Sequence, residues 1–215
     1  HKGQCVAIIG PNGSGKTTLI KAILRLIFPD TGEIHVKERN IKDGCSYREH
    51  IGYMPQISRF PENMKVSELF KMVKSMRSNS PESYDTELFE EFGIEKFADK
   101  KLSVLSGGMK QKVSATLAFL FKPEILILDE PTAALDPISN EILKNKIRES
   151  RNEGKLILIS SHILSDLDTI TSHVLYLYEG KQQIFKSIEQ LRTETSEDKL
   201  NEVIVELLKT RKIHA

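Results

Sequence analysis

A glycine-rich segment between an apolar run and a helical pattern constrains the fold more than any other part of the sequence. The segment reads GPNGSGKTT at residues 10–18 and follows the run CVAIIG at 5–10. It fits the spacing G-x-x-x-x-G-K-[ST], in which glycines let the backbone curl and turn its N–H groups inward. Such a loop stands between a strand and a helix, so the sequence predicts a strand–loop–helix unit of an α/β fold.

This loop predicts a binding site for the phosphates of a nucleotide, because inward N–H groups and the positive end of a helix attract phosphate oxygens. Lys16 is expected to reach the β- and γ-phosphates, Thr17 to bind Mg²⁺, and Thr18 to hold the α- or β-phosphate. The alternative is a glycine-rich turn with an incidental lysine. The nucleotide-binding residues expected here are Gly10, Pro11, Asn12, Gly13, Ser14, Gly15, Lys16, Thr17 and Thr18.

Strand patterns alternate with helical patterns along much of the chain, as in an α/β fold. Continuous apolar runs, typical of strands buried on both faces of a parallel sheet, occupy 5–10, 124–129 and 155–160. A hairpin that turns at Gly180 is predicted from 173–180 and 182–187. Helical patterns occupy about 16–27, 66–78, 82–92, 107–121, 138–152 and 163–170.

The segment 57–105 breaks this alternation, because it carries helical patterns with no strand between them. We read it as a helical subdomain inserted into a P-loop ATPase core formed by 1–56 and 106–187. The tail, 188–215, is separate. We expect its apolar stripe to dock on the domain's own surface, with a partner-binding helix as the alternative. The stripe consists of Leu200, Val203, Ile204, Leu207 and Leu208.

Two carboxylates end an aliphatic run in ILILDEP, residues 125–131. The carboxyl ends of the strands are where open α/β sheets bind ligands. Because successive strand residues point to opposite sides, the two acids are expected to differ in role. Asp129 is the expected Mg²⁺ partner through water, and Glu130 the group that orients or deprotonates an attacking water. The alternative is a strand that ends in solvated acids.

A pair of glycines opens another helical pattern. The stretch LSGGM at 105–109 places them directly behind Ser106, although glycine inside a helix costs about 1 kcal/mol relative to alanine. A serine that caps a helix does not need them. They indicate that another group must approach the bare N–H groups of this helix start.

Three weaker motifs accompany these segments. Gln56 ends GYMPQ, AALD at 133–136 follows the acidic strand, and His162 lies in ISSHILSD after the next apolar run. Each has an ordinary alternative: a loop amide for Gln56, a structural histidine for His162, and, for Asp136, the N-cap of a helix that begins at Pro137.

Taken in order, these motifs resemble the ATP-binding-cassette (ABC) ATPases from Gly3 to about Phe185. The resemblance implies an α/β, RecA-like parallel-sheet core of the P-loop NTPase type with an inserted helical subdomain, and it implies ATP and Mg²⁺ as ligands. The implied catalytic residues are Glu130, His162 and Gln56, and the implied Mg²⁺ ligands are Thr17, Gln56 and Asp129.

The resemblance also implies a composite site. Two copies, or this chain and another ABC ATPase, would pair head to tail. Ser106, Gly107 and Gly108 of one copy would then close over the γ-phosphate held by the other, with Asp136 near the interface. Loss of the γ-phosphate would loosen the pair. Ser106 as a plain N-cap is the alternative, and one residue can serve both roles.

The implied function is ATP hydrolysis that powers a membrane transporter from the cytoplasmic face of the cell membrane. The partner would be an integral-membrane permease, contacted through 57–69. The alternative for that stretch is an ordinary connecting loop. The stretch LSGGM resembles the family's signature motif LSGGQ, with Met109 in place of the glutamine. This variant resembles ABC-2-type exporters. The stretch GYMPQISRFPENM at 52–64 is similar to the ATPase that serves copper-site maturation of nitrous oxide reductase, although no copper-ligand constellation accompanies it.

Two other function classes stay open. One is a non-transport ABC ATPase that acts in DNA repair or on the ribosome. Another is a small-molecule P-loop kinase, which would leave the Ser-Gly-Gly stretch and His162 unexplained. A net charge of +1 over 215 residues gives no electrostatic case for nucleic acid as the main partner.

The remaining composition fits a chain of one domain with a small subdomain. No apolar run approaches the roughly 20 residues that span a bilayer, and no signal-peptide pattern opens the chain. The distant Cys5 and Cys45 favour a reducing compartment such as the cytoplasm. Because the chain starts at His1 within a few residues of Gly10, we expect an upstream segment with further strands and the aromatic residue that stacks on adenine.

Overall fold

A six-stranded sheet forms the centre of the computed structural model, which describes residues 1–77, 83–161 and 164–210. Its strand order is β4-β5-β6-β1-β7-β8, parallel except for the antiparallel β7–β8 pair. The strands are β1 Cys5–Ile9, β4 Ile51–Met54, β5 Ile125–Asp129, β6 Leu156–Ser160, β7 His173–Tyr178 and β8 Lys181–Ser187. The predicted parallel α/β sheet and the hairpin at Gly180 are confirmed.

The sheet separates two hydrophobic clusters among the described residues. In β5, Leu126 and Leu128 belong to one cluster, while Ile127 between them belongs to the other. This alternation follows from strand geometry, in which successive side chains point to opposite faces. Both faces are therefore covered, which explains why the strands read as continuous apolar runs.

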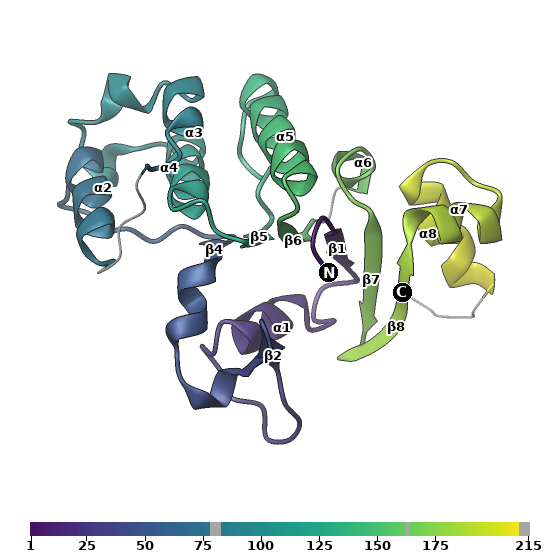
Figure 1. Cartoon of the computed structure of the whole chain (residues 1–215). Helices are drawn as coiled ribbons and strands as arrows, with labels where there is room; N and C mark the ends of the chain where they lie inside the picture. Colours follow the sequence, from purple (N-terminus) through teal and green to yellow (C-terminus); the bar gives the residue numbers. More distant parts are fainter. Residues whose placement is uncertain (78–82, 162–163, 211–215) are drawn as a thin grey trace.

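Helices cover both faces of the sheet (Figure 1). On one face lie α4 Gly107–Phe119, α5 Pro137–Asn152 and α6 Leu164–Leu167. On the other lies α1 Lys16–Ile23, with a small ribbon and two short turns. That ribbon pairs β2 His35–Val36 with β3 Arg39–Asn40, and the turns are η1 Ile41–Asp43 and η2 Ser46–His50.

Strand β4 is not among the strands predicted from apolar runs. It has only four residues and contains Gly52, so its pattern is weak. The structure explains the glycine: a Cβ at Gly52 would lie 2.0 Å from the carbonyl oxygen of Ala118. Helix α4 therefore packs its backbone directly on β4, which only glycine permits.

The segment predicted as a helical subdomain contains α2 Val66–Ser75, α3 Glu87–Glu91, η3 Ile94–Phe97 and η4 Leu102–Val104. Its described residues hold no named strand, only an isolated bridge between Lys65 and Lys101. The predicted helical character is thus confirmed, with helices shorter than expected. Residues 78–82 lie outside the described part. The division into 1–56 with 106–187, 57–105 and 188–215 stays a prediction.

The C-terminal tail docks on the domain itself. It consists of α7 Ile188–Thr195 and α8 Leu200–Thr210, and α8 contacts α6 and α7. The stripe residues Leu200, Val203, Ile204 and Leu207 are at most 5% exposed, and Leu208 packs against the same core. The predicted docking is confirmed. Within the described residues, none of the helices combines the length and apolarity that crossing a bilayer requires.

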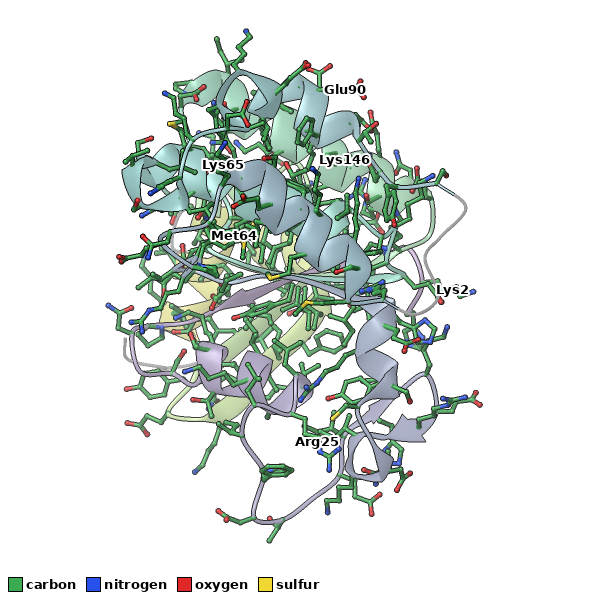
Figure 2. All side chains as sticks on the ribbon, turned by 90° about the vertical axis from the view of Figure 1, so that its left-hand side faces the viewer. Lys2, Arg25, Met64, Lys65, Glu90 and Lys146 are labelled. Atoms are coloured by element: carbon green, nitrogen blue, oxygen red, sulfur yellow. The ribbon has the colours of Figure 1, made fainter. Side chains whose placement is uncertain are left out.

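A buried ionic cluster joins α5 to the start of α3. The ammonium of Lys146 lies 2.8 Å from a carboxylate oxygen of Asp85 and 2.5 Å from one of Glu87. The side chains of Lys146 and Asp85 are only 8% and 9% exposed. Figure 2 shows Lys146 on the same side of the sheet as Lys65, with Arg25 on the opposite side. Burial alone would lower the pKa of Lys146, but hydrogen bonds to the two carboxylates outweigh it and raise the pKa.

Removing this cation should destabilise the fold strongly. In Lys146→Met, Asp85 keeps a buried carboxylate without its cation, so we expect the free energy of unfolding to fall by about 3 kcal/mol. Urea denaturation measures it. Lys199→Met removes an exposed pair with Glu202 and should cost less than about 0.5 kcal/mol. Equal losses in the two variants would contradict a structural role for the buried cluster.

Candidate active site

The phosphate loop lies between β1 and α1, against the turn of the β7–β8 hairpin. Gly10 has φ +150°, and a Cβ there would lie 2.1 Å from the carbonyl oxygen of Leu177. The N–H of Gly180 donates to the carbonyl of Ser14 over 3.1 Å. The hairpin therefore supports the loop from one side, and the close approach at residue 10 requires glycine.

A cavity of about 210 Å³ opens beside this loop and collects predicted site residues from three separate parts of the chain. The loop contributes one wall, Gln56 follows β4, and Asp129 and Glu130 come from the end of β5. The full lining is Asn12, Gly13, Ser14, Gly15, Lys16, Thr17, Thr18, Gln56, Asp129 and Glu130.

The remaining predicted residues stand elsewhere. Gly10 and Pro11 do not line the cavity, but their carbonyls bind Lys16. Ser106, Gly107, Gly108 and Asp136 are also absent from its lining. This separation is what the composite-site hypothesis expects of groups that serve a second copy. His162 lies outside the described residues.

Lys16 carries positive charge into this buried setting. Its ammonium is held at 2.8 Å from the carbonyl oxygen of Gly10 and 3.1 Å from that of Pro11, and the residue is 8% exposed. Burial lowers the pKa of Lys16, while the negative charges of Glu130 and Asp129 act in the opposite direction. The cavity lining therefore combines a cation, which can bind phosphate oxygens, with carboxylates, which can bind a metal ion.

The two acids do not point to opposite sides of a strand, so that prediction is wrong. Strand β5 ends at Asp129, and Glu130 has φ +54°, in the left-handed region. The chain turns there, and both residues, 4% and 8% exposed, line the same cavity. The alternation of side chains applies only while the backbone stays extended.

Ser160, at the end of β6, organises this turn. Its hydroxyl donates to a carboxylate oxygen of Asp129. The N–H of Glu130 donates to both the carbonyl oxygen and the hydroxyl oxygen of Ser160, each over 3.1 Å. Ser160 is not among the site residues predicted from the sequence. The available signal was a polar residue at the end of a buried strand, in LILISS.

The cavity residues fit the phosphates of a nucleotide together with Mg²⁺. The hydroxyl of Ser14 is buried and has no hydrogen-bond partner among the described residues, so a polar group entering the loop would satisfy it. Thr17, Gln56 and Asp129 offer oxygen atoms, which Mg²⁺ prefers, and Mg²⁺ takes only one or two carboxylates when phosphates complete its shell.

Both predicted N-cap alternatives are present. The hydroxyl of Ser106 accepts from the N–H of Met109 over 3.2 Å at the start of α4. Asp136 caps α5 through the N–H and hydroxyl of Ser139 and lies 3.0 Å from Lys112. These hydrogen bonds hold the pKa of the Asp136 carboxyl well below its usual value. The intersubunit roles of both residues stay predictions.

Gly107 and Gly108, the two glycines behind Ser106, have different surroundings. A Cβ at Gly108 would lie 2.8 Å from the carbonyl oxygen of Ala134, whereas the nearest neighbour of a Cβ at Gly107 is the Cβ of Ala134 at 4.0 Å. Contact within the chain therefore explains Gly108 without a ligand. Gly107 is exposed and open to an incoming group.

Alanine substitutions should separate these two glycines. Gly108→Ala forces a methyl group against the Ala134 carbonyl and should lower the free energy of unfolding by about 1–3 kcal/mol. Gly107→Ala, its matched control, adds a methyl group in ordinary contact and should not destabilise the chain, since alanine favours helices. Thermal unfolding measures both. Equal stability of the two variants would contradict the close contact.

Comparisons with known proteins agree with this geometry. A family model described as ABC transporter matches residues 1–133. Nod factor export ATP-binding protein I from Burkholderia orbicola is 31% identical over 184 residues, which are 84% of this chain and 60% of that protein. The protein of the same name from Rhizobium meliloti is 33% identical over 83% of this chain and 54% of its own length. The chain thus spans about 60% of the length of the first of these relatives.

Solved structures match as well. One, an ATP binding subunit of an ABC transporter, has a TM-score of 0.88 at 31% identity and covers 96% of this chain and 88% of its own. A dimeric bacterial ABC transporter cassette has a TM-score of 0.76 at 24% identity, over 87% of each chain, and shares the fold. The chain therefore belongs to the ABC transporter family and has the fold of its ATP-binding subunit.

Proposed function

We propose that this chain binds and hydrolyses ATP to power a membrane exporter. The observation that carries the proposal is the cavity in which the phosphate loop, Lys16, Gln56, Asp129 and Glu130 meet. Its relatives named for Nod factor export support the transport role. A permease would supply the membrane-spanning part, so the chain would work at the cytoplasmic face of the membrane.

Each cavity residue has a proposed task in this reaction. Lys16 and the N–H groups at the start of α1 would hold the phosphates. Thr17, Gln56 and Asp129 would hold Mg²⁺, which neutralises charge on the phosphate oxygens when bound. Glu130 would take the proton of the attacking water, since its buried position places a carboxylate at the cavity wall. His162 would face the γ-phosphate.

We further propose that two copies share each nucleotide. Ser106 and Gly107 are exposed and lie outside the cavity of their own chain. A bare helix start of this kind suits the γ-phosphate held by a second copy. ATP would then favour the paired state by its extra contacts there, and hydrolysis would remove them. The dimeric bacterial cassette of the same fold supports this pairing.

The cargo and the exact contact with the permease stay predictions. The copper-maturation hypothesis rests on the stretch at 52–64, and the permease contact on 57–69. Co-purification of the chain with its native partners would separate a transporter from a DNA-repair or ribosomal ATPase. Recovery of a membrane permease supports the transport role, and recovery of ribosomes or DNA alone would contradict it.

Loss of the Glu130 carboxylate should stop hydrolysis but not binding. For Glu130→Gln we expect an unchanged Kd for ATP and a turnover at least about 100-fold lower, because the general base is lost. Phosphate release and a fluorescent ATP analogue measure the two quantities. Lys16→Ala is the contrasting variant and should weaken binding itself. Normal turnover of Glu130→Gln would refute the base assignment.

A negative charge at Gly107 should prevent pairing. In Gly107→Asp the carboxylate would face the γ-phosphate of the second copy, while a carboxylate in the first turn of a helix favours folding. We expect normal ATP binding but no ATP-dependent dimer in light scattering. This variant and its control are both made in the Glu130→Gln background, so that ATP is not hydrolysed during the measurement. Gly107→Asn is the control of nearly equal size. If Asp and Asn variants pair equally well, the shared site is wrong.

A further inference from the structure

The main chain of Glu130 is held from two sides. Its N–H donates to the carbonyl and hydroxyl oxygens of Ser160 in β6. Its carbonyl oxygen accepts from the side-chain amide of Gln111 over 3.3 Å and from the N–H of Ala133 over 3.2 Å. Glu130 has φ +54°, an unusual backbone conformation for a residue with a side chain. Such conformations persist only where surrounding contacts hold them.

Gln111 is well suited to hold this turn. It lies in α4 and is 5% exposed, so its amide is removed from water and depends on a partner within the protein. Its side chain spans from the helix to a backbone carbonyl 19 residues later in the chain. A polar residue on the buried side of a helix is costly unless it makes such a bond.

Helix α4 touches the segment 130–136 at two further places. Gly108 lies under the carbonyl of Ala134, which has φ +65°. Lys112, the residue after Gln111, lies 3.0 Å from Asp136. The whole turn, from Glu130 to the cap of α5, therefore rests on the first turns of α4. The start of α4 therefore contacts the segment 130–136 through Gln111, Gly108 and Lys112.

We propose that Gln111 is a positioning residue for ATP hydrolysis: its amide fixes the Glu130 main chain, and so aims the Glu130 carboxylate into the cavity. This inference rests on the catalytic role proposed for Glu130. In this role Gln111 acts through the Glu130 main chain. It also ties one copy's catalytic turn to the helix whose start, Ser106 and Gly107, would contact the nucleotide of the other copy.

The test replaces the amide with an apolar chain of similar length. Gln111→Met should lower kcat about tenfold, as a small misplacement of a catalytic group does, with little change in KM or in ATP affinity. Hydrogen exchange of the amides at 130–136 should become faster even without nucleotide. Thr116→Val is the matched control. It removes another buried polar side chain of α4, whose hydroxyl donates to the Lys112 carbonyl over 2.9 Å, and it should leave kcat and that exchange unchanged.

Parallel measurement of Glu130→Gln separates the possible failures. If Glu130→Gln is inactive while Gln111→Met keeps normal kcat, the positioning role is overturned and the base assignment stands. If Thr116→Val loses as much kcat as Gln111→Met, the effect is general destabilisation of α4 and the proposal is again overturned. If Glu130→Gln hydrolyses ATP normally, the catalytic role fails, and with it the positioning role.

Discussion

The contact between Gly10 and the carbonyl of Leu177 fixes the place of the phosphate loop, and the cavity depends on it. The loop backbone touches the β7–β8 hairpin where any side chain would collide. Ser14 and Gly180 add a hydrogen bond beside this contact. With one edge of the loop set by the sheet, the start of α1 and the Lys16 ammonium have defined positions opposite the end of β5. The cavity geometry thus follows from main-chain packing more than from side-chain interactions.

The buried polar groups of the cavity are stabilised by hydrogen bonds and opposite charges among themselves. Asp129 and Glu130 are nearly inaccessible to water, and a buried charge is costly without hydrogen bonds or opposite charge. Ser160 bonds Asp129 by its side chain and Glu130 by its carbonyl and hydroxyl oxygens, and Lys16 provides opposite charge. These groups come from three separate elements, β5 with the turn that follows it, β6 and α1, which meet at one edge of the sheet. The parallel sheet is what makes the cluster possible, because it brings the carboxyl ends of its strands together.

Much of this arrangement could be predicted from the sequence, and the exceptions have physical causes. Long apolar runs predicted β1, β5 and β6, and the glycine spacing predicted the loop, since both signals are local. Strand β4 is short, and Gly52 weakens its apolar pattern. This glycine is required by the close approach of the α4 backbone, more than sixty residues later in the chain. The turn at Glu130 could not be read from alternation, because it depends on partners in β6 and α4. Gln111 resembles any other polar helix residue until its partner across the fold is known. Gly107 and Gly108 were predicted to share one role, contact with a nucleotide. In the structure only Gly108 lies too close to Ala134 to carry a side chain.

The ionic cluster at Lys146 has a consequence for how the helical segment sits on the core. An ammonium carries three donors and can keep contact with two carboxylates over a range of angles, whereas interlocked aliphatic side chains allow one arrangement. Asp85 and Glu87 thus attach the start of α3 to α5 by charge, beside the apolar packing of the α3 residue Leu88 in the interior. Any movement of α3 against α5 therefore has to keep Asp85 and Glu87 within reach of one ammonium, or it leaves the buried Asp85 carboxylate without its cation.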